Sequence, residues 1–460
     1  MSLPERFVAT LCEAVGREYV LDEAAALTPY AQDALLQPSL PDVVVLPGST
    51  SDVARVAALC NLQRVPLVVR GAGTGYTGGA VPTAGGVVLS MERLNRILEI
   101  DQQNLLAIVE PNVITAELQR EVEKVGLFYP PDPASLEESS LGGNVAECAG
   151  GPRAFKYGVT RRYVLALEAV LPTGEVIHTG SKAVKNVVGY DLTQLLVGSE
   201  GTLAIVTRIT LRLIPKPPDR TTAAAAFGSI GDAVDAVSAL IERRVVPAAI
   251  ELIDEESLVA AALHTGIQIV PPGTKALLIV ECDGIPAAVR DEMQLVVRAC
   301  ETAGVMQVRT ADNEAERSEI WSVRRQISLA LRATGLLKIN HDVVVPRGRV
   351  PQLYEAVEDL RHRFNLRIAA FGHAGDGNIH VNLMVDRTKP EELGRAKQAE
   401  RVLFERVLAL EGSITGEHGI GYSKKPYIAM ELGDDQIALM KRVKAAFDPN
   451  GILNPGKIFP

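Results

Sequence analysis

Residues 371–382 read Phe-Gly-His-Ala-Gly-Asp-Gly-Asn-Ile-His-Val-Asn, and residues 412–421 read Gly-Ser-Ile-Thr-Gly-Glu-His-Gly-Ile-Gly. Apolar residues alternate on both sides of the Gly-Asp-Gly-Asn cluster, a pattern that predicts a β-hairpin turning at that cluster. In the second strand, the alternation places His380 and Asn382 on the same face of the sheet. The turn would bring His373 back towards His380, so we expect the two imidazoles to lie close together.

Two imidazoles and one carboxylate are typical ligands of a divalent metal. Glu417, in the second stretch, would complete a three-ligand set with His373 and His380 that leaves coordination positions open. His418 follows directly and could act as a base. An isolated histidine is more often a structural residue, but here glycines expose the backbone around these side chains. The pattern therefore predicts a metal-containing active site.

The composition of the 460-residue chain indicates a soluble, globular protein of two or three domains. Hydrophobic residues make up 47% of the chain and charged residues 22%, which argues against disorder. The formal net charge of -9 argues against nucleic acid as a partner, because phosphate binding needs a basic surface. No uncharged run reaches the roughly 20 residues that cross a bilayer, so we expect no transmembrane segment.

The five cysteines are widely spaced and include no Cys-x-x-Cys pair. This spacing is typical of free thiols in a reducing compartment, and it excludes an iron–sulfur cluster bound by these cysteines alone. The first apolar stretch contains Glu5, Arg6 and Glu13, so no secretory signal is visible. We expect a cytoplasmic protein, and docking at the periphery of a membrane complex stays open.

The order of apolar runs and chain breakers divides the sequence into segments. Residues 1–40 are expected to form a helical lead-in, and a β/α pattern occupies 41–218. The run Ile-Pro-Lys-Pro-Pro at 214–218 predicts a linker, because clustered prolines stop both helix and sheet. Strand and helix patterns over 219–411 predict an α+β domain with an antiparallel sheet. Residues 412–460 are expected to return to the first domain.

A glycine-rich loop follows the strand expected at 66–70. Residues 69–79 read Val-Arg-Gly-Ala-Gly-Thr-Gly-Tyr-Thr-Gly-Gly, and such glycines let successive backbone N–H groups converge on a phosphate. Tyr76 occupies the sixth position of the Rossmann spacing Gly-x-Gly-x-x-Gly, and the glycine- and proline-rich residues after it cannot open the required helix. With further glycine blocks at 141–151 and 198–202, we predict non-Rossmann loops that bind a large cofactor; a bare turn-rich connection is the alternative.

Together these motifs resemble the FAD-linked oxidases of the vanillyl-alcohol oxidase/p-cresol methylhydroxylase type. The similarity runs from about residue 40 to the Asn-Pro-Gly-Lys at 454–457. The pairing of His-Ala-Gly-Asp-Gly-Asn-Ile-His with Thr-Gly-Glu-His-Gly-Ile-Gly resembles the D-2-hydroxy-acid dehydrogenase branch, which contains the glycolate oxidase FAD subunit, D-lactate dehydrogenase and D-2-hydroxyglutarate dehydrogenase. The resemblance implies an α+β fold: a two-lobed FAD-binding domain with an α+β cap domain built on an antiparallel sheet.

The resemblance also implies roles for single residues. His373, His380 and Glu417 match the metal ligands of the branch, and their mixed nitrogen and oxygen donors favour Zn²⁺ or Mn²⁺. His418 would be the catalytic base. Relatives with a covalent flavin often carry His where this chain has Thr74, so the resemblance implies that FAD is bound non-covalently.

Further residues of the branch recognise the substrate or the flavin. Arg324 and Lys338 match positions that hold the substrate carboxylate, and Asn382 matches a polar position beside the substrate. Ser328 stands where the 2-hydroxyglutarate enzyme has Thr, which weakens an assignment to that substrate. The residues implied to contact FAD are Arg70, Gly71, Ala72, Gly73, Thr74, Gly75, Thr77, Gly78, Pro131, Gly142, Gly143, Asn144, Tyr157, Gly158, Glu200, Gly201, Ile205 and Asn454.

The implied function is FAD-dependent oxidation of a D-2-hydroxy acid, of the glycolate or D-lactate type, to the 2-oxo acid. The metal would chelate the substrate while hydride passes to the flavin. The electron acceptor would be an iron–sulfur subunit or a soluble carrier, and a homodimer stays open. Two alternatives use the same scaffold: an alcohol or sugar oxidase, and an electron-transfer subunit that no hydroxy acid reduces.

Overall fold

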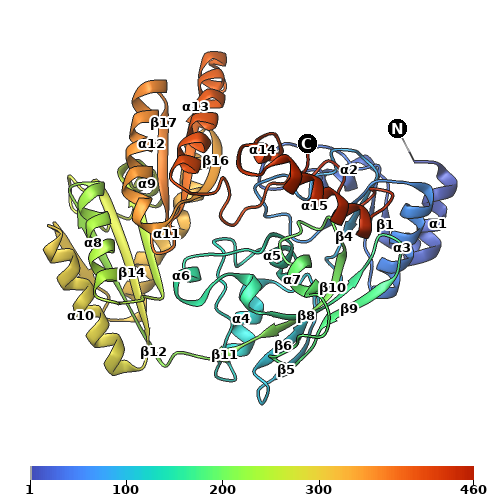
Figure 1. Cartoon of the computed structure of the whole chain (residues 1–460), viewed down its shortest axis with the longest axis horizontal. Coiled ribbons are helices and arrows are strands. Elements are labelled where there is room, and N and C mark those ends of the chain that lie inside the picture. The colour runs from blue at the N-terminus through green and yellow to red at the C-terminus, as the bar shows by residue number, and fades with distance from the viewer. Residues whose placement is uncertain (1–2) are drawn as a thin grey trace. The chain divides into compact units, whose positions relative to one another are not determined.

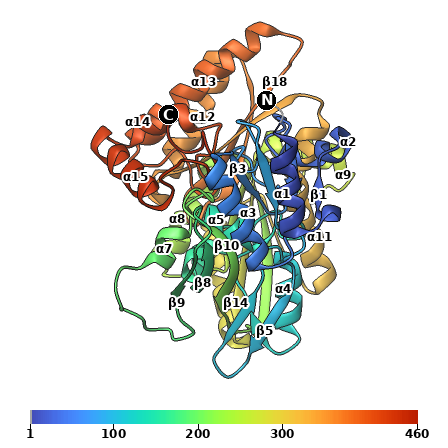
Figure 2. The same ribbon diagram turned by 90° about the vertical axis from the view of Figure 1, so that its right-hand side faces the viewer.

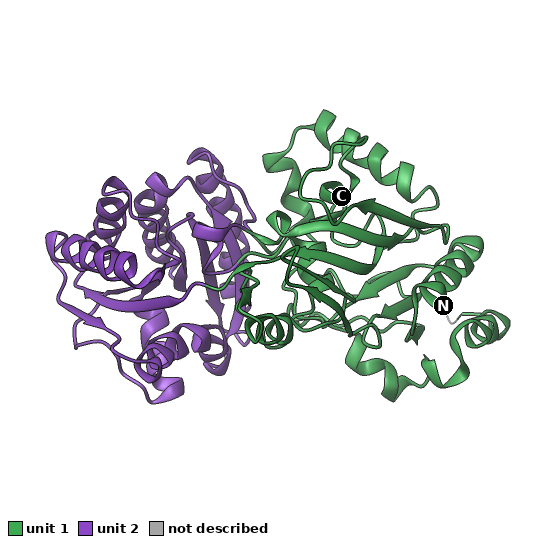
Figure 3. Cartoon of the chain, turned by 90° about the horizontal axis from the view of Figure 1, so that it is seen from below, with its two compact units in different colours: residues 1–150, 159–216, 417–460 green, residues 151–158, 217–416 purple. Residues whose placement is uncertain are grey.

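The computed structural model describes residues 3–460, and the chain forms two compact units (Figure 3). Unit 1 comprises Met1–Gly150, Val159–Lys216 and Glu417–Pro460, and unit 2 comprises Gly151–Gly158 and Pro217–Gly416. The domain boundaries expected from the sequence stay predictions. The compact units differ from them most at Gly151–Gly158, which packs in unit 2 although it precedes the proline-rich linker.

A four-stranded sheet forms the first part of unit 1. In spatial order its strands are β1 (Val20–Leu21), β2 (Val43–Val45), β4 (Val87–Ser90) and β3 (Leu67–Arg70). The second and third pairings are parallel. The three valines of β2 are all fully buried, as expected for a parallel strand covered on both faces. The segment expected to be helical thus also contributes a strand, β1, to this sheet.

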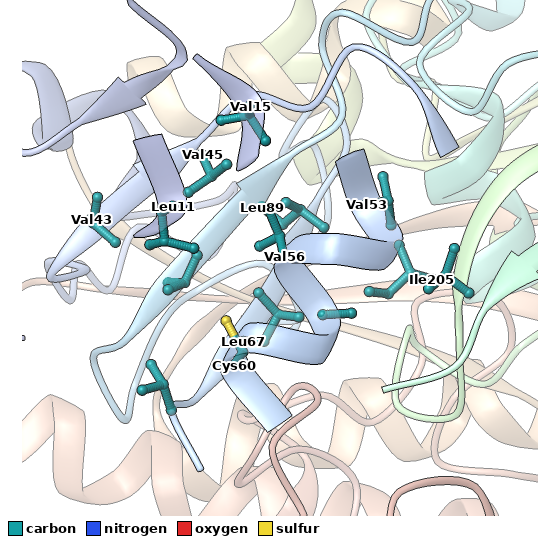
Figure 4. Close-up of a cluster of buried hydrophobic side chains, with 14 of the residues drawn as sticks. Leu11, Val15, Val43, Val45, Val53, Val56, Cys60, Leu67, Leu89 and Ile205 are labelled. Carbon is teal, nitrogen blue, oxygen red and sulfur yellow. The ribbon is translucent and has the colours of Figure 1, made fainter. Parts of the chain in front are cut away.

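The main core of unit 1 lies between this sheet and two helices, α1 (Glu5–Val15) and α3 (Thr50–Gln63) (Figure 4). The two helices lie side by side (Figure 2). Ser49 begins α3, because its side chain accepts a hydrogen bond from Asp52 N, a cap that contributes about 1 kcal/mol. Burial raises the pKa of Cys60 to about 12, so this thiol is part of the core and not a reactive group.

A five-stranded antiparallel sheet completes unit 1. Its strands in order are β5 (Ile97–Asp101), β6 (Leu106–Val109), β10 (Ile205–Arg212), β8 (Val164–Val170) and β9 (Val176–Gly180). A short pair joins β7 (Leu127–Phe128) to β11 (Ile214–Pro215). The remaining helices of unit 1 are α2 (Ala24–Leu27), α4 (Thr115–Glu123), α5 (Leu141–Glu147), α7 (Leu192–Leu196), α14 (Ile428–Glu431) and α15 (Asp434–Phe447).

The second glycine block differs in part from the sequence prediction, because Leu141–Glu147 form helix α5 and not a loop. Ser140 caps the helix by accepting a hydrogen bond from Gly143 N. A Cβ atom on Gly142 would lie 2.6 Å from Pro111 Cβ and 2.9 Å from its carbonyl oxygen. Glycine is therefore present for close packing within a helix, a role that sequence reasoning could not separate from a turn.

Unit 2 is built on a seven-stranded sheet in which every pairing is antiparallel (Figure 1). The strands in order are β15 (Gln307–Thr310), β12 (Asp219–Phe227), β14 (Ala276–Gly284), β13 (Ala249–Asp254), β17 (Arg367–His373), β18 (Asn378–Val385) and β16 (Leu337–Val344). The antiparallel sheet and the α+β class expected from the sequence are therefore confirmed, as is the hairpin formed by β17 and β18.

Helices cover both faces of this sheet. Those on one face are α8 (Ile230–Glu242), α10 (Pro286–Thr302), α12 (Val350–Phe364) and α13 (Pro390–Ala409). The other face packs against α9 (Glu255–Thr265) and α11 (Glu314–Ala333). A short helix, α6 (Ala154–Tyr157), contacts β13. Among residues 3–460, no helix is long and apolar enough to span a membrane.

Acidic residues interrupt the apolar pattern of strand β13. β13 reads Ala-Ile-Glu-Leu-Ile-Asp and is buried along its whole length, with Glu251 at 0% and Asp254 at 2% exposure. Two acids in a buried strand remove the apolar pattern that predicts one. Both acids are paired: Glu251 with Arg324, and Asp254 with Arg361.

The hairpin turn gives a test of the fold. Gly377 has φ +84°, and a Cβ atom there would lie 2.0 Å from the carbonyl oxygen of Val345. Gly377→Ala should lower the free energy of unfolding by about 2–4 kcal/mol, through left-handed strain and steric overlap. Gly394→Ala is the control: the residue lies in α13, where an added Cβ atom would meet no atom outside the local helix backbone within 4 Å, and the change should stabilise by about 0.5–1 kcal/mol. Denaturant unfolding measures both, and equal stabilities would contradict the described turn.

Candidate functional site

His373, His380, Asn382 and Lys338 lie on one face of the sheet in unit 2. His380 pairs with Phe371 across the hairpin, and His373 pairs with Glu251 of β13. Residues that pair in antiparallel strands point to the same face. Phe371 belongs to the hydrophobic cluster beneath α9 and α11, so the two histidines and Glu251 face α11, the helix that carries Arg324.

The two histidines approach each other as predicted, with ring centroids 5.4 Å apart. Candidate ligand atoms of His373, His380 and Glu417 all lie within 4.8 Å of one another. Glu417 directly follows Gly416, whose N–H donates to Asp342 Oδ2 of β16 at 3.0 Å. This hydrogen bond fixes the chain beside Asp342, which pairs with His380 in the sheet. The separation of the candidate ligand atoms suits one small ion.

Glu251 connects the histidine pair to Arg324. Its Oε1 lies 2.5 Å from His373 Nδ1, and its Oε2 accepts a short hydrogen bond from Arg324 Nε. Burial raises the pKa of Glu251, but the charge of Arg324 and the hydrogen-bonding contacts with His373 and Arg324 outweigh burial, so the pKa lies below its ordinary value. An ionised Glu251 keeps the proton of the neutral imidazole on Nδ1, which leaves Nε2 of His373 as the ligand atom.

Two cations on this face are suited to a carboxylate. Arg324 is 4% exposed, and among residues 3–460 its Nη2 is buried without a hydrogen-bond partner. Lys338 Nζ donates to Ser328 Oγ at 2.6 Å. Burial lowers the pKa of Lys338 to about 7, with further lowering by Arg332 and Arg324. A bound anion would offset the effects of burial and of the neighbouring arginines, and would favour the charged form of Lys338.

Asn382 is buried beneath a second amide. Its Nδ2 donates to the carbonyl oxygens of Ala369 and His380, and its Oδ1 accepts from Asn340 Nδ2 at 2.7 Å. Asn340 is half-buried, and its Oδ1 has no hydrogen-bond partner within residues 3–460. Sequence reasoning missed Asn340, although its alternation with Lys338 in β16 places both on the same face.

In unit 1, the glycine-rich loop has the backbone geometry that its composition predicts. Gly73 and Gly78 have φ +71° and +79°, backbone angles that residues with a side chain rarely adopt. Lys457 Nζ holds the loop by donating to the carbonyl oxygens of Gly78 and Val81, each at 2.6 Å. Burial lowers the pKa of Lys457 to about 8, so the lysine is mainly charged at pH 7. Sequence reasoning missed Lys457, although it ends the quoted Asn-Pro-Gly-Lys motif.

The same loop packs against the start of α5. Ser140 Oγ accepts hydrogen bonds from Ala72 N and Gly143 N, both at 3.3 Å. A Cβ atom on Gly71 would lie 2.3 Å from Ser140 Oγ, so a side chain there would displace the hydroxyl that accepts these two hydrogen bonds. Two glycine blocks from distant parts of the sequence therefore pack together, as the cofactor prediction requires.

Glu200 and Asn454 fix backbone segments around this loop. The Glu200 carboxylate accepts from Ile420 N at 2.8 Å and from Gly421 N at 2.6 Å. Asn454 accepts from Val69 N at 3.0 Å and donates to the Glu200 carbonyl oxygen at 2.8 Å. Both side chains therefore have structural partners, and direct contact with FAD stays a prediction.

His418 is held by the glycine-rich loop. Its ring stacks on Tyr76 with centroids 5.1 Å apart and planes inclined by 21°. Thr77 Oγ1 donates to the His418 carbonyl oxygen at 3.2 Å. The loop predicted to bind the cofactor thus also orients the predicted base.

The structure gives several other predicted FAD residues structural partners. The Ile205 side chain lies in the core of unit 1 (Figure 4), so only its backbone could face a ligand. Arg70 directs its guanidinium to the Gln32 carbonyl oxygen at 2.8 Å. Tyr157 belongs to unit 2, where its hydroxyl donates to Asp283 at 2.7 Å. The sequence alone did not distinguish such roles from cofactor contact.

Comparison with known proteins identifies the family. Residues 41–180 match the model of the FAD binding domain, and residues 216–458 match that of the FAD linked oxidases, C-terminal domain. The chain belongs to the FAD-linked oxidases. The FAD-binding match supports FAD as the cofactor of this FAD-linked oxidase.

Named relatives cover almost the whole chain. The glycolate oxidase subunit GlcD of Bacillus subtilis (strain 168) is 43% identical over 450 residues, covering 98% of this chain and 96% of the relative. The D-lactate dehydrogenase of Anaerostipes hadrus is 38% identical and covers 91% of this chain and 89% of the relative. The resemblance to the D-2-hydroxy-acid dehydrogenase branch, which the sequence motifs indicated, is confirmed.

Solved structures agree on the fold. p-Cresol methylhydroxylase with bound substrate has a TM-score of 0.81 at 21% identity, covering 99% of this chain and 96% of that one. 4-Ethylphenol oxidase from Gulosibacter chungangensis has a TM-score of 0.80, also at 21% identity, covering 99% and 97%. The predicted fold type of this FAD-linked oxidase is therefore confirmed.

Lys457 provides a test of the FAD loop. Lys457→Met removes two charge-assisted hydrogen bonds from the carbonyl oxygens of the loop, each worth about 1.5–3 kcal/mol. FAD affinity should fall at least about tenfold as the loop loosens. The ratio of flavin to protein absorbance after gel filtration measures the loss. Lys441→Met, on the exposed face of α15, is the control and should retain FAD; equal retention by both variants would contradict the role of Lys457.

Proposed function

We propose that this protein oxidises a D-2-hydroxy acid of the glycolate or D-lactate type to the 2-oxo acid with FAD. The observation that carries the proposal is the single sheet face that holds the histidine pair together with Arg324 and Lys338. A 2-hydroxy acid needs both features, because its hydroxyl and carboxylate chelate a metal while cations neutralise its charge. The names of the relatives support this substrate class.

His373, His380 and Glu417 would hold the metal through two nitrogens and one oxygen, a set that suits Zn²⁺ or Mn²⁺. The donor set fits such an ion, since Glu251 keeps Nε2 of His373 available. A bound divalent ion supplies Lewis acidity, which lowers the pKa of bound water to about 7 and acts in the same direction on an alcohol. The three ligands leave positions open for the substrate.

Arg324 and Lys338 would bind the carboxylate. The Nη2 of Arg324 offers a buried N–H group, and Lys338 adds a point charge. Because burial lowers the pKa of Lys338 to about 7, a bound anion would increase the fraction of the lysine that is charged. This arrangement would favour acids over neutral alcohols.

His418 would take the hydroxyl proton, since it adjoins Glu417 in sequence and is oriented by Tyr76 and Thr77. A positioned base contributes about 10²–10⁴-fold to the rate. FAD, when bound, accepts the hydride from the α carbon. With Thr74 where covalent relatives often carry His, FAD would be held by non-covalent contacts alone, and the gel-filtration measurement above depends on this.

The electrons would pass to an iron–sulfur subunit or a soluble carrier. The relative from Bacillus subtilis is named a subunit, which supports assembly into a complex. The five cysteines are free thiols in the described structure, so a cluster would belong to a partner. A cytoplasmic location, at most peripheral to a membrane complex, goes with this proposal.

Metal removal tests the proposal. Anaerobic mixing of the metal-loaded protein with glycolate or D-lactate should bleach the flavin, because hydride transfer reduces it. Exhaustive chelation should abolish bleaching and leave the spectrum of oxidised FAD unchanged, and added Zn²⁺ or Mn²⁺ should restore it. Bleaching by primary alcohols or sugars would favour the oxidase alternative. FAD that no hydroxy acid reduces would favour the electron-transfer subunit.

A second test removes the proposed base. His418→Asn should retain FAD and metal yet reduce its flavin at least about 10²-fold more slowly, the lower end for loss of a general base. Stopped-flow absorbance measures the rate, and residual activity should rise with pH as hydroxide replaces the imidazole. His264→Asn, on the exposed side of α9, is the control. Flavin reduction by His418→Asn at the parent rate would exclude His418 as the base.

A further inference from the structure

We propose that Glu251 is a positioning residue that couples metal binding to recognition of the substrate carboxylate. The inference rests on the function proposed above and adds a residue to it. Glu251 comes from β13, an element that contributes no predicted ligand, and its side chain is 0% exposed. It touches neither the metal nor the substrate in this scheme and acts through two neighbours.

One carboxylate serves both sites, with one oxygen for each. Oε1 lies 2.5 Å from Nδ1 of His373, and Oε2 accepts from Nε of Arg324. The first contact selects the imidazole tautomer whose Nε2 is open to a metal. The second fixes the guanidinium so that its buried Nη2 stays available. The guanidinium also lies over the Phe371 ring at 4.8 Å, which restricts its movement further.

The chemistry requires two acceptors. Nδ1–H of His373 and Nε–H of Arg324 are both donors, and only a carboxylate offers an acceptor oxygen to each of them. A glutamine presents one oxygen and one NH₂ group. The charged guanidinium competes better for the oxygen, because hydrogen bonds to ionised groups are stronger. The NH₂ would then face His373, which must accept on Nδ1 and carry its proton on Nε2, where the metal should bind.

This conflict predicts an unusual rescue. Glu251→Gln should lower zinc affinity about 10–100-fold, the range for loss of a residue that orients a ligand. Adding Arg324→Met removes the competing donor, so the glutamine oxygen can turn to His373 and zinc affinity should return to near the parent value. Arg324→Met alone should leave zinc affinity unchanged. If Glu251 only stabilised the fold, adding Arg324→Met to Glu251→Gln would not restore zinc affinity.

The experiment uses the full-length flavoprotein after metal depletion. Zinc affinity is measured by competition with a fluorescent chelator, without substrate, and the visible spectrum of bound Co²⁺ reports the coordination. KM for D-lactate, or for glycolate if that is the better substrate, should rise in all three variants, since each disturbs or removes Arg324. The double variant should therefore separate the two functions, binding zinc normally while keeping a high KM.

Glu281→Gln is the matched control. Glu281 is a buried acid of β14 that accepts hydrogen bonds from Thr222 Oγ1 and Trp321 Nε1, both at 2.9 Å. Its loss should change stability without changing zinc affinity. If Glu251→Gln does not fold, the double variant, which removes the paired charges together, carries the test against Arg324→Met.

The outcomes separate the two proposals. Parent-like zinc affinity in Glu251→Gln, or equally weak binding in the single and double variants, would overturn the coupling and leave the proposed function intact. A parent protein that binds neither Zn²⁺ nor Mn²⁺ would overturn both. Weaker zinc binding in Glu251→Gln, with parent-like zinc binding in the double variant, supports the coupling.

Discussion

The antiparallel register of β13, β17 and β18 is the constraint on which the candidate site depends. Side chains alternate between the faces of a strand, so a slip of one residue would move a whole set to the opposite face. The observed register pairs His373 with Glu251 and His380 with Phe371. One hydrogen-bonded ladder thus determines both the polar site and the hydrophobic cluster beside it.

Charged groups on a buried sheet face require partners, and these partners explain much of the local architecture. Removing an ion from water costs several kcal/mol, and an unpaired buried charge is strongly destabilising. Glu251 is therefore paired with Arg324, and on the opposite face Asp254 is paired with Arg361. The first pair joins β13 to α11 among the candidate site residues, whereas the second joins β13 to α12 on the other face. Similar electrostatics thus support a site on one face and packing on the other.

The sequence predicted the hairpin and the three candidate ligands because each depended on local pattern: period-two alternation, a glycine turn and short motifs. It did not predict Glu251, Asn340 or Lys457, whose importance comes from pairing between distant segments. Glu251 also made strand β13 hard to predict, because an acidic residue interrupts the run of apolar residues that indicates a buried strand. The block at 141–151 was expected to be a loop, because glycine selected for close packing and glycine selected for a turn look alike in sequence.

The C-terminal residues have a consequence for biosynthesis. Leu67 N donates to Ile452 O, Asn454 N donates to Leu67 O, and Lys457 holds the glycine-rich loop through Gly78 and Val81. Chains emerge from the ribosome amino terminus first, at about 5–20 residues per second. The cofactor loop, made early, is completed only once residues 452–457 have been translated, so we expect stable flavin binding to begin after that point.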